Sequence, residues 1–205
     1  MSKLIAFEGI DRSGKTTQIR KLYDHFAALK LKFYITREPC DYDVRFELKN
    51  GCLTPEQQLK LILKDRIKHN PTIKYLLEDS DLVLCDRYTD STLAYQGYGH
   101  GLNLDNLRKL NHEATGGIDP DMVILFDCPV EVAVRRNLDK PLDKVERDLL
   151  FLDRVRFGYL ELAGQNGWTV IDANQSEDLV FEEVKKLIVP MIPEEDREYL
   201  KARLF

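Results

Sequence analysis

The sequence lacks the features that indicate a secreted protein, a membrane-spanning protein or a protein held together by zinc sites. Its 205 residues include four cysteines that lie far apart without a Cys-x-x-Cys pair, which argues against zinc or disulfide frameworks. No apolar run approaches a membrane span, and the few apolar residues before Glu8 indicate a strand rather than a signal peptide. The net charge of −5 argues against a general nucleic-acid binder. We therefore expect a cytoplasmic protein that binds neither nucleic acid nor membrane.

Short apolar runs alternate with helical patterns along the chain. The runs lack polar alternation, which is typical of strands buried on both faces of a parallel sheet. We expect strands at Leu4–Phe7, Lys32–Thr36, Asp81–Cys85, Met122–Phe126 and Trp168–Asp172. We expect helices at Lys15–Leu31, Pro55–Leu77, Leu104–Thr115, Val130–Asn137, Glu146–Asn166 and Glu177–Val189. This order predicts an α/β fold with a doubly wound, parallel five-stranded sheet flanked by helices.

The length suits a single domain, residues 1–205, that is large enough to bury a substantial core. The tail, residues 190–205, is expected to form a short helix or a loose end, with no function assigned to it.

The stretch GIDRSGKT, Gly9 to Thr16, fits the phosphate-binding pattern G-x-x-x-x-G-K-[ST]. It follows a predicted strand and opens a predicted helix, where backbone N–H groups and the positive helix end converge on an anion. Lys15 is expected to reach the β- and γ-phosphates, and the Thr16 hydroxyl to ligate Mg²⁺. The predicted ATP site contains Gly9, Ile10, Asp11, Arg12, Ser13, Gly14, Lys15, Thr16 and Thr17.

This phosphate loop alone does not distinguish GTPases, ATPase modules and kinases. The Asn-Lys-x-Asp motif with which GTPases read guanine is missing from the sequence. Instead, the third predicted strand runs into Asp86 and Arg87, at the sheet edge where the carboxyl ends of parallel strands meet. Asp86 is expected to hold Mg²⁺, usually through water, and Arg87 to face a second anion. Arg37 and Arg66 are expected at the same edge, and the arginine fork suits phosphate.

Four segments together resemble the thymidylate kinase family, whose members phosphorylate dTMP to dTDP on the way to dTTP. They are FEGIDRSGKTTQ, TREP, DRYTDSTLAYQGYGHGL and FDCPVEVAVRR, and the similarity extends to about Val189. The resemblance implies a P-loop nucleoside monophosphate kinase fold with a short lid. It also implies ATP and dTMP as substrates, Mg²⁺ as cofactor and a homodimer.

The resemblance also implies an acceptor site. The family residue that matches Asp11 contacts the sugar 3′-hydroxyl and the metal shell, and the arginine that matches Arg87 binds the monophosphate. An aromatic ring at Tyr95 can block the space of a ribose 2′-hydroxyl. The expected dTMP site contains Asp11, Arg37, Arg66, Arg87, Thr92, Tyr95 and Gln96.

The arginine inside the phosphate loop is the expected catalytic arginine. The acceptor phosphate oxygen is already a nucleophile, so the reaction needs positioning and charge neutralisation rather than a general base. Arg12 is expected to lie over the γ-phosphate as charge spreads in the transition state. Lys15, Arg87 and Asp11 complete the predicted catalytic set.

The family takes its catalytic arginine from this loop or from a lid, which here is expected at residues 137–147. That segment carries Lys140, Lys144 and Arg147, with Lys144 at the position of the lid arginine. We expect Lys144 to contact ATP, and we expect Arg12 to be the residue that mainly stabilises the transition state. The resemblance also implies that Arg135 or Arg136 packs on the adenine face, and Arg135 is assigned to the ATP site.

Three positions depart from the family pattern. Ile62 stands where the family usually has a phenylalanine that stacks on thymine, and Lys64 stands where a small residue is usual. After Arg37-Glu38-Pro39 the chain continues Cys40-Asp41-Tyr42 instead of Gly-Gly-Thr, which leaves open whether Arg45 or Lys49 reaches the monophosphate.

Two alternatives to a dTMP kinase stay open from the residues. One is a kinase for another deoxynucleoside monophosphate, or for a deoxynucleoside, which would need a general base such as Glu8 or Asp86. The other is a non-catalytic nucleotide-dependent switch, which would leave the acceptor-side arginines unexplained.

Overall fold

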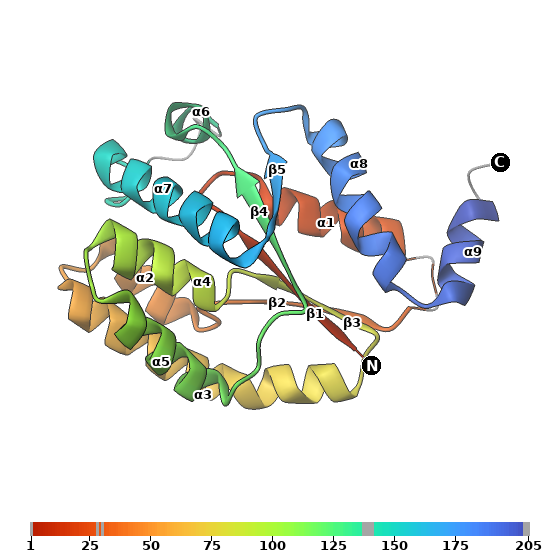
Figure 1. The fold of residues 1–205 in the computed structure, drawn as a ribbon, viewed down its shortest axis with the longest axis horizontal. Coiled ribbons are helices and arrows are strands. Elements are labelled where there is room, and N and C mark those ends of the chain that lie inside the picture. Colours follow the sequence, from red (N-terminus) through yellow and green to blue (C-terminus); the bar gives the residue numbers. More distant parts are fainter. Residues whose placement is uncertain (1, 28, 30, 137–141, 203–205) are drawn as a thin grey trace.

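Five strands form one parallel sheet in the order β2-β3-β1-β4-β5. The computed structural model describes residues 2–27, 29, 31–136 and 142–202. The strands are β1 (Lys3–Glu8), β2 (Phe33–Arg37), β3 (Leu82–Asp86), β4 (Met122–Asp127) and β5 (Thr169–Asp172). The predicted α/β fold with five parallel strands is confirmed, with helices on both sides of the sheet (Figure 1).

Figure 1 places α1 and α8 on one side of the sheet and α3 and α5 on the other, with α9 beside the end of α8. The helices are α1 (Lys15–Phe26), α2 (Tyr42–Asn50), α3 (Pro55–Glu78), α4 (Thr89–Thr92), α5 (Leu104–Thr115), α6 (Val130–Arg135), α7 (Leu149–Asn166), α8 (Glu177–Ile188) and α9 (Glu194–Ala202). A π-helix, η1 (Leu93–Gly99), continues α4, and a 3₁₀ turn, η2 (Val189–Met191), follows α8. No helix in the described part of the chain is both long and apolar enough to cross a membrane.

Alternation along β1 divides the core between the two faces of the sheet. Ile5 and Phe7 belong to the apolar cluster that includes Leu22 of α1, whereas Leu4 and Ala6 belong to the cluster with Ile73 of α3. Both sets are buried, which explains why β1 reads as a continuous apolar run rather than an alternating one.

Two helix boundaries, at the end of α1 and the start of α7, differ from the prediction by three residues or more. Helix α1 ends at Phe26 rather than Leu31, and the next turn is closed by Leu29 donating to the Phe26 carbonyl. Helix α7 begins at Leu149, capped by the Asp148 side chain, so Glu146 lies in the preceding turn rather than in the helix. The end predicted at Asn137 for the preceding helix lies outside the described residues, and α6 itself ends at Arg135.

Helix α2 was not predicted, and it occupies the segment that departs from the family pattern after Pro39. The Asp41 side chain accepts from the Asp43 N–H and caps the helix at its first turn. Asp65 of α3 accepts from the backbone N–H groups of Cys40 (2.7 Å) and Asp41 (2.8 Å). A side chain distant in sequence therefore fixes this loop, which local pattern could not reveal.

The register of the sheet gathers three loops at one edge. Arg37 at the end of β2 pairs with Asp86 at the end of β3, and Asp86 pairs with Phe7 on β1. The phosphate loop, the segment after β2 and the segment after β3 therefore leave the sheet side by side, as expected for the ligand-binding edge of an open parallel sheet.

Candidate active site

The phosphate loop connects β1 to α1 through two glycines in conformations that other residues rarely adopt. Gly9 has φ 140°, and a Cβ there would lie 2.6 Å from the carbonyl oxygen of Phe126. Gly14 has φ 102° and stands at the N-terminus of α1. The loop therefore needs glycine at both positions to turn tightly into the helix.

Lys15 lies beneath the loop as a buried cation. Its Nζ donates to the carbonyl oxygens of Gly9 (3.0 Å) and Ile10 (2.8 Å). Burial, assisted by the charge of Arg87, lowers the pKa of Lys15 to about 8. A poorly solvated ammonium of this kind gains most from a polyanion brought to the loop.

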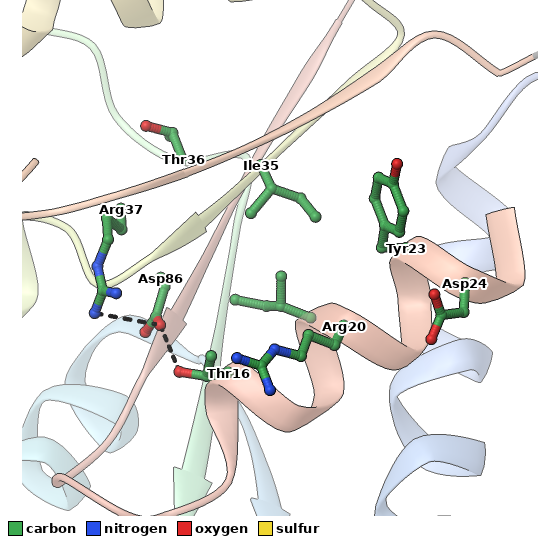
Figure 2. A pocket seen from close by; sticks show the side chains of 9 residues that line it. Thr16, Arg20, Tyr23, Asp24, Ile35, Thr36, Arg37 and Asp86 are labelled. Atoms are coloured by element: carbon green, nitrogen blue, oxygen red, sulfur yellow. Dashed lines mark hydrogen bonds and ion pairs between the residues drawn. The ribbon is translucent and has the colours of Figure 1, made fainter. Parts of the chain in front are cut away.

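A hydroxyl and a carboxylate meet where α1 begins and β3 ends. The Thr16 hydroxyl donates to Asp86 Oδ2 (2.8 Å), and Arg37 Nη2 lies 3.9 Å from the same oxygen. Figure 2 shows these three side chains converging beside a cavity between α1 and β2. The cavity has a volume of about 370 Å³, and Ile19 and Ile35 are among the residues that line it. Paired oxygen ligands of this type suit a hard divalent cation such as Mg²⁺.

The donor cavity lies over the N-terminus of α1. Its volume of about 640 Å³ is in the range of roughly 300–1,000 Å³ that small-molecule sites occupy. Seven of the predicted ATP-site residues line it: Asp11, Arg12, Ser13, Gly14, Lys15, Thr16 and Thr17. Gly9 and Ile10 lie beneath them as the acceptors of Lys15. The prediction missed Gln175, Ser176 and Glu177, which follow β5 at the same sheet edge and also line the cavity.

Besides Gly9 and Ile10, two further residues assigned to the ATP site, Arg135 and Lys144, do not line this cavity. Arg135 is exposed on α6, whereas Arg136 lines the donor cavity and donates to the carbonyls of Arg12 (3.3 Å) and Ala173 (2.5 Å). Of these two arginines it is Arg136 that lines the cavity, because α6 ends at Arg135 and the chain then turns toward the loop; the contact of either arginine with ATP stays a prediction. Lys144 is exposed and does not line the cavity, and Lys140 lies outside the described residues.

Arg12 projects from the phosphate loop toward the turn before α7. Its Nε and Nη2 donate to the two carboxylate oxygens of Glu146 (2.8 and 3.0 Å), and its Nη1 donates to the Arg136 carbonyl (2.8 Å). The hydrogen bonds to Glu146 raise the pKa of Arg12, so the guanidinium stays charged. The expected catalytic arginine therefore lines the donor cavity with an internal carboxylate as its partner.

Arg87 joins the phosphate loop to the segment after β3. It donates to the Asp11 carboxylate (2.8 Å), the Gly9 carbonyl (2.8 Å) and the Tyr95 hydroxyl (3.2 Å). Burial alone would raise the pKa of Asp11, but the charges of Arg87 and Lys15 outweigh it and hold that pKa well below its usual range. Asp11 is therefore a carboxylate in the folded protein.

Arg12 and Arg87 share an unusual backbone conformation. They are the two non-glycine residues with positive φ in the described part of the chain, 63° and 70° respectively. Such conformations cost free energy and concentrate where surrounding structure holds a functional side chain in place. Both arginines belong to the catalytic set expected from the sequence and its family resemblance.

Glu8 is a buried carboxylate beneath Arg87. It accepts from the Tyr88 N–H (2.7 Å), the Ser91 hydroxyl (2.6 Å) and the Tyr159 hydroxyl (2.9 Å). Burial raises the pKa of Glu8 above its ordinary value. These partners make Glu8 a support for the segment after β3, and Glu8 lines neither the donor cavity nor the acceptor cavity.

The acceptor cavity lies between α2, α3 and η1. All seven residues predicted to bind dTMP line it: Asp11, Arg37, Arg66, Arg87, Thr92, Tyr95 and Gln96. Ile62 lines it as well, at the place where the family has a stacking ring. Three residues, Asp11, Arg37 and Arg87, line both this cavity and the donor cavity, so the two cavities meet at the sheet edge.

Arg66 is built into the wall of the acceptor cavity. It is buried and donates to Glu38 Oε2 (2.7 Å) and to Thr92 Oγ1 (3.1 Å). Burial would raise the pKa of Glu38, but the charge of Arg66 reverses the shift and lowers it. The ion pair between Arg66 and Glu38 gives a role to the glutamate of Arg37-Glu38-Pro39. Glu38 is buried and orients Arg66 rather than facing solvent.

Gln96 lines the acceptor cavity and contains a buried polar atom without a hydrogen-bond partner among the described residues. Its side chain is buried, its Nε2 donates to Gln58 Oε1 (3.3 Å), and its Oε1 has no hydrogen-bond partner among the described residues. A buried polar atom without a partner costs free energy, which a ligand with a matching N–H would recover.

Both candidates for an additional phosphate contact, Arg45 and Lys49 of α2, line the acceptor cavity. Arg45 Nη1 donates to the carbonyls of Pro39 (2.7 Å) and Cys40 (2.6 Å) and so helps to hold the loop. Lys49 forms an ion pair with Asp143 (3.3 Å), which lines the same cavity. The structure leaves both within reach of an acceptor anion.

One known protein family matches most of the chain. The family model for thymidylate kinase matches residues 7–184. The thymidylate kinase of Geotalea daltonii is 42% identical over 180 residues, which cover 80% of this chain and 84% of that protein. The chain belongs to the thymidylate kinase family. A second thymidylate kinase, from a Geobacter species, is 40% identical over 204 residues, covering 89% of this chain and 91% of that one.

A solved thymidylate kinase shares the fold. The crystal structure of the enzyme from Ehrlichia chaffeensis matches with a TM-score of 0.73 at 32% identity, covering 91% of this chain and 98% of that one. The resemblance of the four sequence segments and the P-loop nucleoside monophosphate kinase fold are thereby confirmed. As a member of the thymidylate kinase family, the chain is a kinase enzyme.

Proposed function

We propose that this chain transfers the γ-phosphoryl group of ATP directly to dTMP, giving dTDP and ADP. The observation that carries the proposal is the junction of the two cavities at Asp11, Arg37 and Arg87. A donor phosphate over the loop and an acceptor phosphate beside Arg87 would meet there, as a direct in-line transfer requires. The unsatisfied Gln96 oxygen and the ordered Arg66–Thr92 pair support a base-reading role for the far end of the acceptor cavity.

The experiment that tests the proposal is an ADP-release assay with ATP and a panel of acceptors. The panel contains dTMP, dUMP, dCMP, dGMP, TMP with ribose, and thymidine. We expect dTMP to give the highest kcat/KM. A purine monophosphate as the best acceptor would point to a different base, thymidine would point to a nucleoside kinase, and ADP release without any acceptor would point to a nucleotide-dependent switch.

The residues of the site divide the task of charge neutralisation. Lys15 contacts the donor phosphates from beneath the loop, Arg12 approaches the γ-phosphate from the side, and Arg87 holds the acceptor phosphate. Asp11 stays ionised because Arg87 and Lys15 flank it, so it accepts hydrogen bonds and is suited to orient the sugar 3′-hydroxyl. No general base is needed, since the acceptor oxygen is already anionic.

Mg²⁺ fits the oxygen pair formed by Thr16 and Asp86. The hydroxyl and the carboxylate are 2.8 Å apart at the mouth of the donor cavity, and both are ligand types that Mg²⁺ prefers. When bound there, the ion would neutralise part of the negative charge of the donor phosphates. Thr16 and Asp86 are thus the residues that we assign to the metal.

Replacing Asp86 by asparagine should raise the Mg²⁺ concentration needed for half-maximal activity by roughly 10- to 100-fold, the range found when metal-supporting groups are removed. The amide keeps the shape but loses the negative charge. The measurement is a Mg²⁺ titration of initial rates at saturating ATP. Asp24→Asn is the matched control, because Asp24 lines the cavity of Figure 2 without contacting Thr16. An unchanged titration for Asp86→Asn would make Asp86 a purely structural partner of Thr16.

Replacing Ile62 by phenylalanine should lower the KM for dTMP by up to about tenfold, equivalent to about 1.4 kcal/mol. Ile62 lines the acceptor cavity, so an aromatic ring there would stack on a pyrimidine. The kcat should stay unchanged, since stacking is present in ground and transition states alike. Leu179→Phe, on the exposed surface of α8, controls for the added ring. A variant that loses dTMP would show that the cavity has no room for a ring at this position.

We propose that the chain works as a homodimer through α2 and α3. These helices expose apolar side chains at Tyr42, Phe46, Ile67 and Tyr75, which a second subunit would cover. Sedimentation that shows only monomer at micromolar concentration would contradict this.

We further propose that residues 1–205 form one kinase domain with its lid at residues 137–147. We also propose that the protein acts in the cytoplasm, where its four free cysteines would stay reduced.

A further inference from the structure

The ion pair between Arg12 and Glu146 joins the phosphate loop to the turn before α7. The two residues are 134 positions apart in sequence, and their side chains are only 13% and 7% exposed. Both carboxylate oxygens are used, with Nε–Oε1 at 2.8 Å and Nη2–Oε2 at 3.0 Å. This paired geometry on one edge of the guanidinium is the arrangement with which arginine also binds phosphate.

Glu146 is itself held firmly in place. Its Oε2 accepts from the backbone N–H of Asp143 (3.0 Å), and its own N–H donates to Asp143 Oδ1 (2.9 Å). On the opposite side, Nη1 of Arg12 is fixed by the Arg136 carbonyl (2.8 Å). Every nitrogen of the guanidinium therefore has an acceptor within the protein, and the edge that suits phosphate is occupied by Glu146.

We propose that Glu146 is the positioning residue of Arg12: its carboxylate holds the guanidinium at the donor cavity until the γ-phosphate replaces it on the same Nε–Nη2 edge. The inference rests on the proposed function, in which a nucleoside triphosphate occupies that cavity. Binding of the triphosphate is then an exchange of one anion for another on Arg12. The exchange costs part of the donor's binding free energy, because the ion pair with Glu146 must open first.

The exchange predicts a gain of affinity when the competing charge is removed. Glu146→Gln keeps the size of the side chain and an oxygen for the Asp143 N–H, but it replaces the charged acceptor with a neutral one. The probe is the non-hydrolysable ATP analogue AMP-PNP with Mg²⁺, and its Kd is measured by titration calorimetry without acceptor. We expect the Kd to fall about tenfold, within the usual range for coupled residues in contact.

A double-mutant cycle with Arg12→Ala separates exchange from other effects. In the Arg12→Ala background, adding Glu146→Gln should change the Kd by less than about twofold, because the ion pair is already absent. Tightening that persists in that background would reflect simple charge repulsion and would overturn the proposal. Weaker or unchanged binding by Glu146→Gln would also overturn it, because that is the result expected of a purely structural role.

Thermal unfolding checks that the variants stay folded. If Glu146→Gln does not fold, Glu146→Ala replaces it, and we expect the Kd to change in the same direction.

The experiment distinguishes a failure of the proposed exchange from a failure of the proposed function. Wild-type protein that does not bind AMP-PNP at all would contradict the proposed function. Normal binding by wild type without tightening in Glu146→Gln would contradict only the role of Glu146.

Discussion

Replacing Lys15 by alanine is expected to lower kcat/KM for ATP and dTMP by about 10³-fold, near the upper end of what loss of one preorganised donor costs. The ammonium lies buried beneath the loop, bound to two loop carbonyls, and lines the donor cavity. In the transition state, charge moves between donor and acceptor phosphates, and a poorly hydrated cation stabilises it more than solvent can. Steady-state kinetics with the ADP-release assay measures the loss.

The control for Lys15→Ala is Lys21→Ala on the same helix. Lys21 pairs with Asp178 at the surface and does not line the donor cavity, so its removal should change kcat/KM by less than about twofold. Thermal unfolding of both variants shows whether the loop carbonyls of Gly9 and Ile10 need Lys15 for stability. Near-normal turnover by a folded Lys15→Ala protein would remove the phosphate-loop interpretation altogether.

The parts of the fold that sequence predicted are those with a local cause. Apolar runs marked all five strands: the central strands β1, β3 and β4 are buried along most of their length, whereas the edge strands β2 and β5 are partly exposed. The phosphate loop was visible because its glycines and lysine stand at fixed spacing. Helix α2 was missed because it buries none of its residues and its apolar residues alternate, at Tyr42, Val44, Phe46 and Leu48, a spacing that is typical of a strand rather than a helix.

The parts of the site that sequence missed depend on contacts between distant residues. Nothing near Glu146 indicates that Arg12 will be its partner, since the pair forms only when the chain returns to the loop 134 residues later. The choice of Arg136 over Arg135 depends on where α6 ends, and helix ends are set by one or two residues. The π-helical turn at Leu93–Gly99, which places Tyr95 and Gln96 at the acceptor cavity, likewise has no local signature.

Replacing Arg12 by alanine is expected to lower kcat by roughly 10³- to 10⁵-fold, the contribution of an arginine that contacts the transferred phosphoryl group. The KM for dTMP should change little, because Arg12 does not line the acceptor cavity. A loss in kcat without a loss in acceptor binding marks an interaction made mainly in the transition state.

Arg12→Ala has two effects that must be separated. It removes the catalytic guanidinium, and it leaves the carboxylate of Glu146 without its ion-pair partner. An unpaired, largely buried charge destabilises the protein on its own account. Arg12→Ala/Glu146→Gln removes both charges, so it should recover thermal stability but not kcat. If kcat recovers as well, the loss in the single variant came from the stranded carboxylate rather than from catalysis. Lys144→Ala is the comparison variant. Lys144 is exposed and does not line the donor cavity, so its removal should lower kcat less than Arg12→Ala does. A larger loss of kcat in Lys144→Ala would instead assign the catalytic role to the segment before α7.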